Sequence, residues 1–189
     1  MKTEQQKLLL NLGSGATNFG PEWIHIDVAD FNHIQGNDVA LNGWSNNSVD
    51  LIYSSHMLEY FSRKDAEFLL KNWFNVLKPG GIIRLSVPDF YILSMIYNKN
   101  NNLDDILGPL YGQMGMNQDT IYHKTCYDVY SLGSLLKKVG FKDIKRWDWR
   151  INPVDDCSAA HWPHRPENIK NRKFDDDQIL ISLNLEAKK

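Results

Sequence analysis

The sequence has few cysteines, no long apolar stretch and no excess of charge of either sign. Only Cys126 and Cys157 occur among 189 residues, too few for a disulfide framework, so we predict reduced thiols in the cytoplasm. No apolar run approaches the ~20 residues of a membrane-spanning helix, and the polar start is unlike a signal peptide. The net charge of −2 disfavours nucleic acid as a partner, and the absence of a membrane-spanning run disfavours a membrane. It leaves a small molecule or a glycan as the expected partner.

The remaining composition is ordinary for a soluble globular protein. The apolar fraction is 42% and the charged fraction 23%, and this length is sufficient for one real core. We therefore predict a single domain over residues 1–189. A segment at about 150–177 is rich in Pro, Asp, His and Asn and is longer than most connections. We interpret it as a polar lid over an acceptor pocket.

Four apolar runs end in glycine, an acid or a polar loop, as the strands of a parallel α/β sheet do. In such a sheet, ligands bind beyond the carboxyl ends of the strands. Gly13 and Gly15 would let the first turn bring its backbone close to a ligand, and Asp27 could accept hydrogen bonds from a ribose. The runs are LNLGSG at 10–15, IHID at 24–27, VDLIY at 49–53 and LKPGGIIRL at 77–85.

Periodicity and turn residues predict the remaining elements. Ser62 can cap a helix by accepting from the amide of Asp65. We expect this helix to present an apolar stripe of Phe68, Leu69, Trp73, Val76 and Leu77, and to end at the Pro-Gly-Gly of 79–81. Further helices are predicted around 91–97 and over 127–139. Strands are predicted at 7–12, 23–27, 38–41, 49–54, 82–87, 142–149 and 179–187.

The ordered runs resemble the class I S-adenosylmethionine-dependent methyltransferases, especially the small type-11-like group, whose central segment is similar to SSHMLEY at 54–60. The similarity covers roughly residues 7–141. It implies a doubly wound, mostly parallel seven-stranded sheet of Rossmann-like type. An antiparallel edge strand at 179–187 and a truncated first helix are also implied. The implied cofactor is S-adenosylmethionine, with S-adenosylhomocysteine as its product.

The resemblance also implies roles for individual residues. A solvated strand-end carboxylate is the alternative interpretation of Asp27. The adenine region departs from the family, which usually has an Asp-Leu pair where Ala40-Leu41 stand. The resemblance implies that the turn Leu12, Gly13, Ser14 and Gly15 passes beneath the methionine and ribose, and that Asp27 binds the ribose hydroxyls. It implies that Asp38, or the backbone from Val39 to Leu41, lies near the adenine. It also implies that Ser54, Ser55 and His56 close over the donor beside its methyl group.

A nicotinamide- or flavin-binding domain is the main alternative for the glycine turn and its acid. The third glycine of a dinucleotide fingerprint would fall at Asn18. Only seven residues, 16–22, separate the turn from the second strand, too few for the helix whose N-terminus holds a pyrophosphate. S-adenosylmethionine carries no phosphate and tolerates this loss. A non-catalytic donor-binding or scaffold protein on the same fold is a further alternative.

Methyl transfer from a sulfonium is an in-line displacement, so aligning the acceptor with the methyl group is the main task. We predict O-methylation of a hydroxyl on a small polar molecule or glycan. His56 is the predicted general base, since an unperturbed histidine titrates near ~6.5. The alternative is that His56 orients its loop without accepting a proton. For Glu59 the alternative to a functional role is a structural one.

The second half of the sequence supplies the remaining candidates. Trp147, Trp149 and Trp162 either form an aromatic wall or are buried at the sheet edge. Zinc is suggested by the spacing of a cysteine and two histidines, but a structural zinc site needs four ligands, so no metal is predicted. The acceptor-site candidates are Tyr60, Asp89, His123, Tyr127, Asp155 and Asp156, and the residues tested for zinc are Cys157, His161 and His164.

Overall fold

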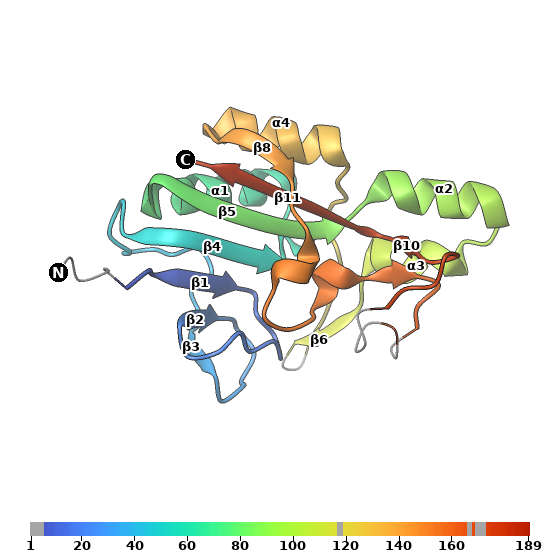
Figure 1. Ribbon diagram of the computed structural model, residues 1–189, viewed down its shortest axis with the longest axis horizontal. Helices are drawn as coiled ribbons and strands as arrows, with labels where there is room; N and C mark the ends of the chain where they lie inside the picture. The colour runs from blue at the N-terminus through green and yellow to red at the C-terminus, as the bar shows by residue number, and fades with distance from the viewer. Residues whose placement is uncertain (1–5, 117–118, 166–167, 169–172) are drawn as a thin grey trace.

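A computed structural model describes residues 6–116, 119–165, 168 and 173–189. Its centre is a seven-stranded sheet in the order β3-β2-β1-β4-β5-β11-β8 (Figure 1). The strand order reverses beside β1, and such a switch point is where α/β sheets bind ligands. The strands are β1 (Leu9–Leu12), β2 (Trp23–Ile26), β3 (Ile34–Gly36), β4 (Val49–Ser55), β5 (Leu77–Pro88), β8 (Lys142–Arg146) and β11 (Ser182–Lys188).

The sheet confirms the predicted doubly wound, mostly parallel α/β fold of Rossmann-like type. β1 to β5 run parallel, and β11 is antiparallel to both of its neighbours, β5 and β8. β11 lies second from the edge, and β8 takes the outermost position. Pairing on both sides suits β11, because five of its seven residues are buried. No helix forms between β1 and β2, as predicted.

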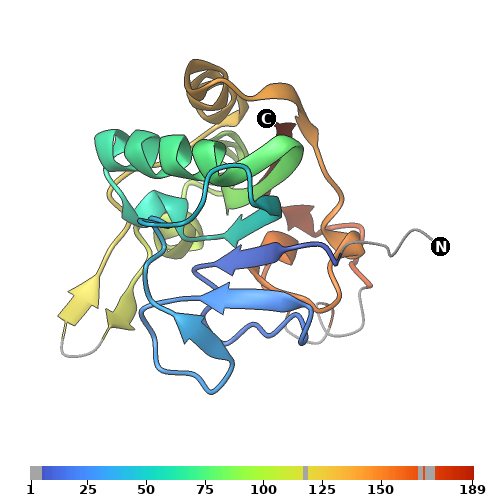
Figure 2. The same ribbon diagram turned by 90° about the vertical axis from the view of Figure 1, so that its left-hand side faces the viewer.

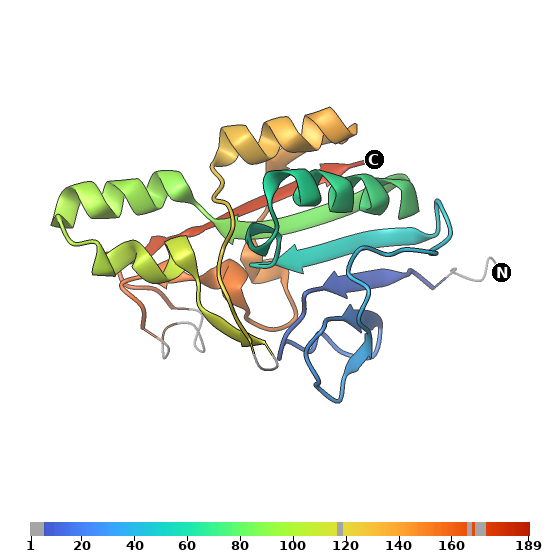
Figure 3. The same cartoon turned by 180° about the vertical axis from the view of Figure 1, so that it is seen from behind.

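Two helices cover one face of the sheet (Figure 3): α1 (Arg63–Val76) and α4 (Val129–Val139). The Ser62 side chain caps α1 by accepting from the amide of Asp65, as predicted. Leu69, Trp73 and Val76 are buried, but Phe68 is 56% exposed. Phe68 and Trp73 are five residues apart, which turns Phe68 about 140° away from Trp73 around the helix.

Two further boundaries differ from the prediction. The third strand forms at 34–36 instead of 38–41, because the Asp38 carboxylate accepts from the amides of Ala40 and Asn42 and so stabilises a turn. β5 starts directly after α1 and includes the Pro-Gly-Gly segment. The predicted helix near 91–97 is confirmed as α2 (Phe90–Asn100), and α3 (Asp104–Tyr111) follows it.

Short elements, drawn in orange and red in Figure 1, lie over the opposite face of the sheet or, as β9 (His161–Trp162) and β10 (Ile179–Leu180) do, beside α2 and α3. Of the four elements named below, the first three fall wholly or partly within the predicted lid at 150–177. Trp147 and Trp149 pack with Phe19 and Tyr53 in a buried cluster, so they form core and not an aromatic wall. The elements are η2 (Trp149–Ile151), η3 (Cys157–Ala159), β9 (His161–Trp162) and β10 (Ile179–Leu180).

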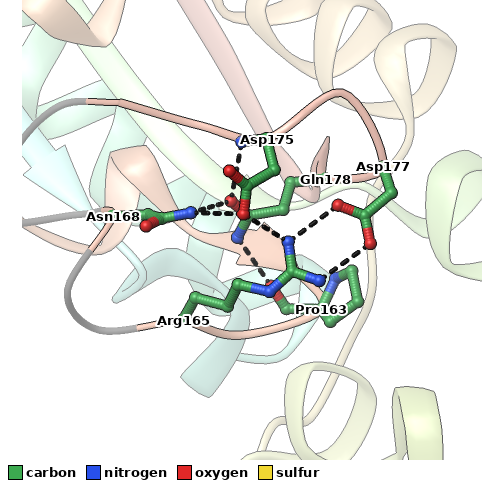
Figure 4. Close-up of polar contacts among 6 residues, drawn as sticks. All are labelled: Pro163, Arg165, Asn168, Asp175, Asp177 and Gln178. Atoms are coloured by element: carbon green, nitrogen blue, oxygen red, sulfur yellow. Dashed lines mark hydrogen bonds and ion pairs between the residues drawn. The ribbon is translucent and has the colours of Figure 1, made fainter.

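Polar contacts join the two ends of the segment that follows β9 (Figure 4). The Arg165 guanidinium donates to the carboxylates of Asp175 and Asp177, and the Gln178 amide donates to the carbonyl of Pro163 at 2.8 Å. Residues 166, 167 and 169–172 of the predicted lid lie outside the described part. Within the described residues, no helix combines the length and apolarity that crossing a bilayer requires.

Candidate functional site

A cavity of about 840 Å³ opens at the carboxyl ends of β1, β2 and β4. Figure 2 shows these strands pointing toward the side where the paired strands β6 (Met114–Met116) and β7 (Asp119–Ile121) lie. Pockets that hold small ligands usually measure roughly 300–1,000 Å³. The cavity is lined by Asn11, Gly13, Ser14, Gly15, Ala16, Thr17, Asp27, Val28, Ala29, Asp30, Phe31, Val39, Ser55, His56, Met57, Tyr60, Phe61, Met114, Gly115, Ile121, Tyr122, Lys124, Asp156 and Cys157.

Asp27 ties the glycine turn to the end of β2. Its two carboxylate oxygens accept from the amides of Gly15 and Ala29, each at 2.8 Å. Gly13 donates its own amide to the carbonyl of Ile26 at 2.8 Å. A carboxylate has further lone pairs beyond these two contacts, and Asp27 lines the cavity. It is therefore placed to accept from a ligand's hydroxyl groups as well.

The turn between β1 and β2 requires glycine at position 13. Gly13 has φ +68°, and a Cβ there would lie 2.3 Å from Cγ of Met57. Gly15 also has a positive φ, of +51°, but a Cβ there would meet nothing within 4 Å. Gly13 is thus fixed by both conformation and space, and Gly15 by conformation alone. Met57, which the sequence analysis did not place at the site, forms the opposite wall.

Strand alternation decides which predicted neighbours of the turn reach the cavity. Leu12 is fully buried and belongs to the core packed under α1, whereas Asn11 lines the cavity. Ser54 is buried outside the cavity lining, and Ser55 lines it. Successive side chains on a strand point to opposite faces, so only one of each pair can face the ligand.

Of the residues predicted to lie near the adenine, Val39 lines the cavity. Asp38 does not line it, because its carboxylate caps the turn at Ala40 and Asn42. The segment that follows Asp27 lines the cavity instead, from Val28 to Phe31. Its position directly after the strand-end acid is a signal that the sequence analysis did not use.

The acceptor-site candidates divide into two groups. Tyr60 and Asp156 line the cavity, whereas Asp89, His123, Tyr127 and Asp155 do not. Asp89 is buried as the cap of α2, accepting from the amide of Tyr91. The lining residues that the sequence analysis missed include five from β6, β7 and the residues after them: Met114, Gly115, Ile121, Tyr122 and Lys124.

His56 lines the cavity with both ring nitrogens directed at protein groups. Nε2 lies 2.8 Å from Oγ of Ser182, and Nδ1 lies 3.6 Å from Oε1 of Glu59. Burial, with a smaller contribution from His123, lowers the pKa of His56 to about 3. A base of such low pKa takes up protons poorly at neutral pH. The surroundings therefore favour the orienting role of His56 over the predicted role as general base.

The three residues considered for zinc do not form a cluster. His161 places Nδ1 2.6 Å from the carbonyl of Ala159, and its ring stacks on Phe174 with centroids 3.6 Å apart. Over the described ranges, no group of three or more His, Cys, Asp or Glu side chains is arranged to hold a metal ion. Cys157 instead contributes to the cavity lining.

Three polar atoms of the cavity lining have no hydrogen-bond partner among the described residues: Nδ2 of Asn11, Oγ of Ser14 and Oγ of Ser55. Buried polar groups are nearly always paired, so these atoms are available to a ligand. Together with the Asp27 carboxylate and the close glycine backbone, they suit a ligand with hydroxyl, amino and carboxylate groups.

Comparison with known proteins agrees with this geometry. Residues 15–85 match the family model described as a methyltransferase domain. An S-adenosylmethionine-dependent methyltransferase from Archaeoglobus fulgidus has a TM-score of 0.59 and 16% identity, covering 97% of this chain and 86% of that chain. No curated protein matches the sequence.

Two further solved structures share the fold. A possible histamine N-methyltransferase from Thermotoga maritima has a TM-score of 0.59 and 13% identity, over 98% of this chain and 83% of that one. The 1,6-didemethyltoxoflavin N1-methyltransferase of Burkholderia thailandensis, with bound 1,6-didemethyltoxoflavin and S-adenosylhomocysteine, has a TM-score of 0.53 and 13% identity. It covers 96% of this chain and 70% of that one.

Proposed function

We infer that this chain, a class I S-adenosylmethionine-dependent methyltransferase, transfers the methyl group to a hydroxyl of a small polar molecule or of a glycan end. The observation that carries the proposal is the cavity at the switch point of the sheet. Its lining includes the glycine turn and Asp27 as well as Tyr60, Tyr122 and Lys124, and we assign the donor to the first group and the acceptor to the second, which we call the acceptor end. Its volume of about 840 Å³ suits a donor together with a small acceptor.

The residues of the glycine turn fit the donor. Gly13, Ser14 and Gly15 bring backbone and an unpartnered hydroxyl to the cavity, and Asp27 offers its carboxylate to ribose hydroxyls. When bound, S-adenosylmethionine supplies an electrophilic methyl group on a sulfonium sulfur. Ser55 ends β4 and His56 follows it; both would stand beside that group, with Val39 and Phe31 near the adenine.

The acceptor end offers polar contacts without a strong base. Lys124 and the hydroxyls of Tyr60 and Tyr122 can orient a polar acceptor, and the hydroxyl proton can leave to water through the open side of the cavity. His56 holds the shape of the loop beside the transfer point. Alignment of the acceptor oxygen with the methyl group then accounts for most of the acceleration.

Two measurements test this function. Calorimetry should detect binding of S-adenosylmethionine and S-adenosylhomocysteine but not of NAD, and NAD binding alone would overturn the donor assignment. Methyl-labelled donor is then incubated with acceptors that share one scaffold and differ only in a hydroxyl, amine or thiol. We expect label on the hydroxyl compound. Label on the amine or thiol compound alone would reject O-methylation while retaining the donor.

A further inference from the structure

Glu59 is a buried acid that no step of the proposed transfer uses. It belongs to η1 (Leu58–Tyr60), immediately after the cavity residues His56 and Met57. The residue is 1% exposed, and within the described residues neither carboxyl oxygen has a hydrogen-bond partner. An unpaired carboxylate is costly to bury. The position of this side chain therefore needs an explanation.

The tautomer of His56 follows from its other neighbour. Oγ of Ser182 donates its only proton to the carbonyl of Cys157 at 2.7 Å. It can therefore only accept from Nε2 of His56, which lies 2.8 Å away. The proton of the neutral ring must then be on Nε2, and Nδ1 carries a lone pair. That lone pair faces Oε1 of Glu59 at 3.6 Å.

A lone pair on Nδ1 is satisfied by a donor opposite it, and Glu59 can supply one only in its protonated form. Burial raises the pKa of Glu59 to about 8, in agreement with a neutral carboxyl. The oxygen and nitrogen would need to approach by about 0.6 Å to reach the usual separation of ~3.0 Å. The present contact is thus a poised hydrogen bond, not a formed one.

The same carboxyl also faces the base of the segment that carries β6 and β7. We name residues 112–116 and 119–122 the β6–β7 arm. Oε1 of Glu59 lies 3.9 Å from Nε2 of His123, the residue that follows the arm. His123 donates its amide to the carbonyl of Tyr111 at 2.7 Å, which closes the base of the arm. The ring fits tightly against Gly112, where a Cβ would lie 2.3 Å from Nε2.

The backbone of Glu59 makes the second connection to this segment. Its carbonyl accepts from the amides of Lys124 at 2.8 Å and of Thr125 at 3.3 Å. Lys124 and four residues of the arm line the cavity. Main chain and side chain of Glu59 thus join the loop after β4 to the stretch that forms one wall of the cavity.

We propose that Glu59 is a positioning residue, whose protonated carboxyl joins His56 to the base of the β6–β7 arm and so fixes the acceptor end of the cavity. The term acceptor end rests on the proposed function, but the contacts do not. The titratable groups that face Glu59 are His56, His123, Tyr60, Tyr127 and Cys157. Burial lowers the pKa of both histidines and raises the pKa of the two tyrosines and the cysteine, so all five stay neutral around Glu59 near pH 7.

The first test reads the histidine tautomer and needs no donor or acceptor. In ¹⁵N-labelled protein, the His56 ring should show the Nε2–H tautomer near neutral pH. Its signals should shift in one step at a pH of about 8, where Glu59 ionises. Glu59→Gln keeps a donor but cannot ionise, and it should remove this step. Glu67→Gln on α1 is the control, because the Glu67 carboxylate pairs with Lys71 and Lys138 instead, and it should retain the step.

The second test reads the arm by amide hydrogen exchange. Glu59→Leu should make the amides of β6 and β7 exchange about tenfold faster than in Glu59→Gln, since loss of one buried hydrogen bond changes local stability by roughly that ratio. Three results would overturn the proposal: an Nδ1–H tautomer, a persisting step in Glu59→Gln, or equal exchange in the two variants. If Glu59→Gln does not unfold cooperatively, the ¹³C carboxyl titration of the wild type decides. A Glu59 carboxyl that ionises below pH 6 then refutes the proposal.

Because no ligand takes part, these outcomes are independent of the methyl-transfer experiments. Absence of O-methylation would leave the tautomer and exchange results intact. A wrong tautomer would leave donor binding and methyl transfer intact.

Discussion

At the scale of single residues, Asp27 and Asp38 make the same local contacts but differ in what they face. Each carboxylate accepts from two backbone amides in the loop after its strand or turn. Only Asp27 lines the cavity. Local chemistry alone does not distinguish a ligand-binding aspartate from a turn-capping one, so the two serve as a matched pair.

We expect Asp27→Ala to weaken S-adenosylmethionine binding by ~1.5–3 kcal/mol, because hydrogen bonds to a charged group are worth that amount. Asp38→Ala, which removes an equivalent cap outside the cavity lining, should change the affinity by less than about 0.5 kcal/mol. Isothermal titration calorimetry measures both. Equal losses in the two variants would mean that Asp27 acts only through the fold of its loop.

The two glycines of the first turn give a second residue-scale prediction. Ala at either position must adopt a positive φ, at a cost of ~1–2 kcal/mol, but only Gly13→Ala also meets Met57. That clash should add ~1–3 kcal/mol of overpacking. In urea unfolding, the free energy of unfolding of Gly13→Ala should therefore be lower than that of Gly15→Ala. Adding Met57→Ala should reduce the difference, and a difference that survives it would exclude the clash as its cause.

At the scale of elements, β4 holds the segment that contains η2 and η3 through one side chain. The Tyr53 hydroxyl donates to the Asp156 carboxylate and accepts from Nδ2 of Asn152 at 2.9 Å. Asp156 also accepts from the backbone and the side chain of Ser158. Asp156 is thus held in position by neighbours, and this fixes one wall of the cavity.

Tyr53→Phe should lower the free energy of unfolding by ~1–3 kcal/mol, because it removes the two hydrogen bonds of a buried hydroxyl. The matched control is Tyr130→Phe on α4, where the residue is 82% exposed, and we expect no more than about 0.5 kcal/mol there. Urea denaturation compares the variants. Equal effects would show that the Tyr53 hydroxyl does not anchor this segment.

At the scale of the whole molecule, buried titratable groups predict a stability maximum near neutral pH. Burial lowers the pKa of His25, His56, His123 and His161. Below about 6.5 the unfolded chain binds protons on these rings that the folded chain does not. Stability is therefore lost as the pH falls. Glu59 acts in the opposite direction, since its folded pKa is raised to about 8.

Between a pH of about 4.5 and about 8, the folded chain keeps the Glu59 proton that the unfolded chain has released, so Glu59 costs stability as the pH rises. Where the histidines of the unfolded chain are largely protonated they outweigh Glu59, and where they are largely neutral Glu59 is the dominant group of these five. Thermal unfolding across pH 5–9 should show the maximum. Glu59→Gln should flatten the loss of stability above the maximum and steepen the gain below it, and an unchanged alkaline side would contradict the raised pKa of Glu59.

The sequence by itself determined the order of strands, the missing first helix and the glycine turn with its acid. These depend on apolar runs, on turn residues and on a connection of seven residues, all of which are local. Gly13, Gly15, Asp27 and His56, which were named from the sequence, all line the cavity. The residue roles and the single-domain interpretation remain predictions.

Tertiary structure alone decided which neighbours face the cavity, where the 150–177 segment packs and how the acids ionise. Strand alternation separates Asn11 from Leu12, but its phase is set by packing against α1. Trp147 and Trp149 pack with Tyr53 of β4, and Asp156 accepts from its hydroxyl, although Tyr53 lies about one hundred positions earlier in the chain. Charge states of Glu59 and His56 depend on burial by distant elements, because desolvation acts through every group that excludes water.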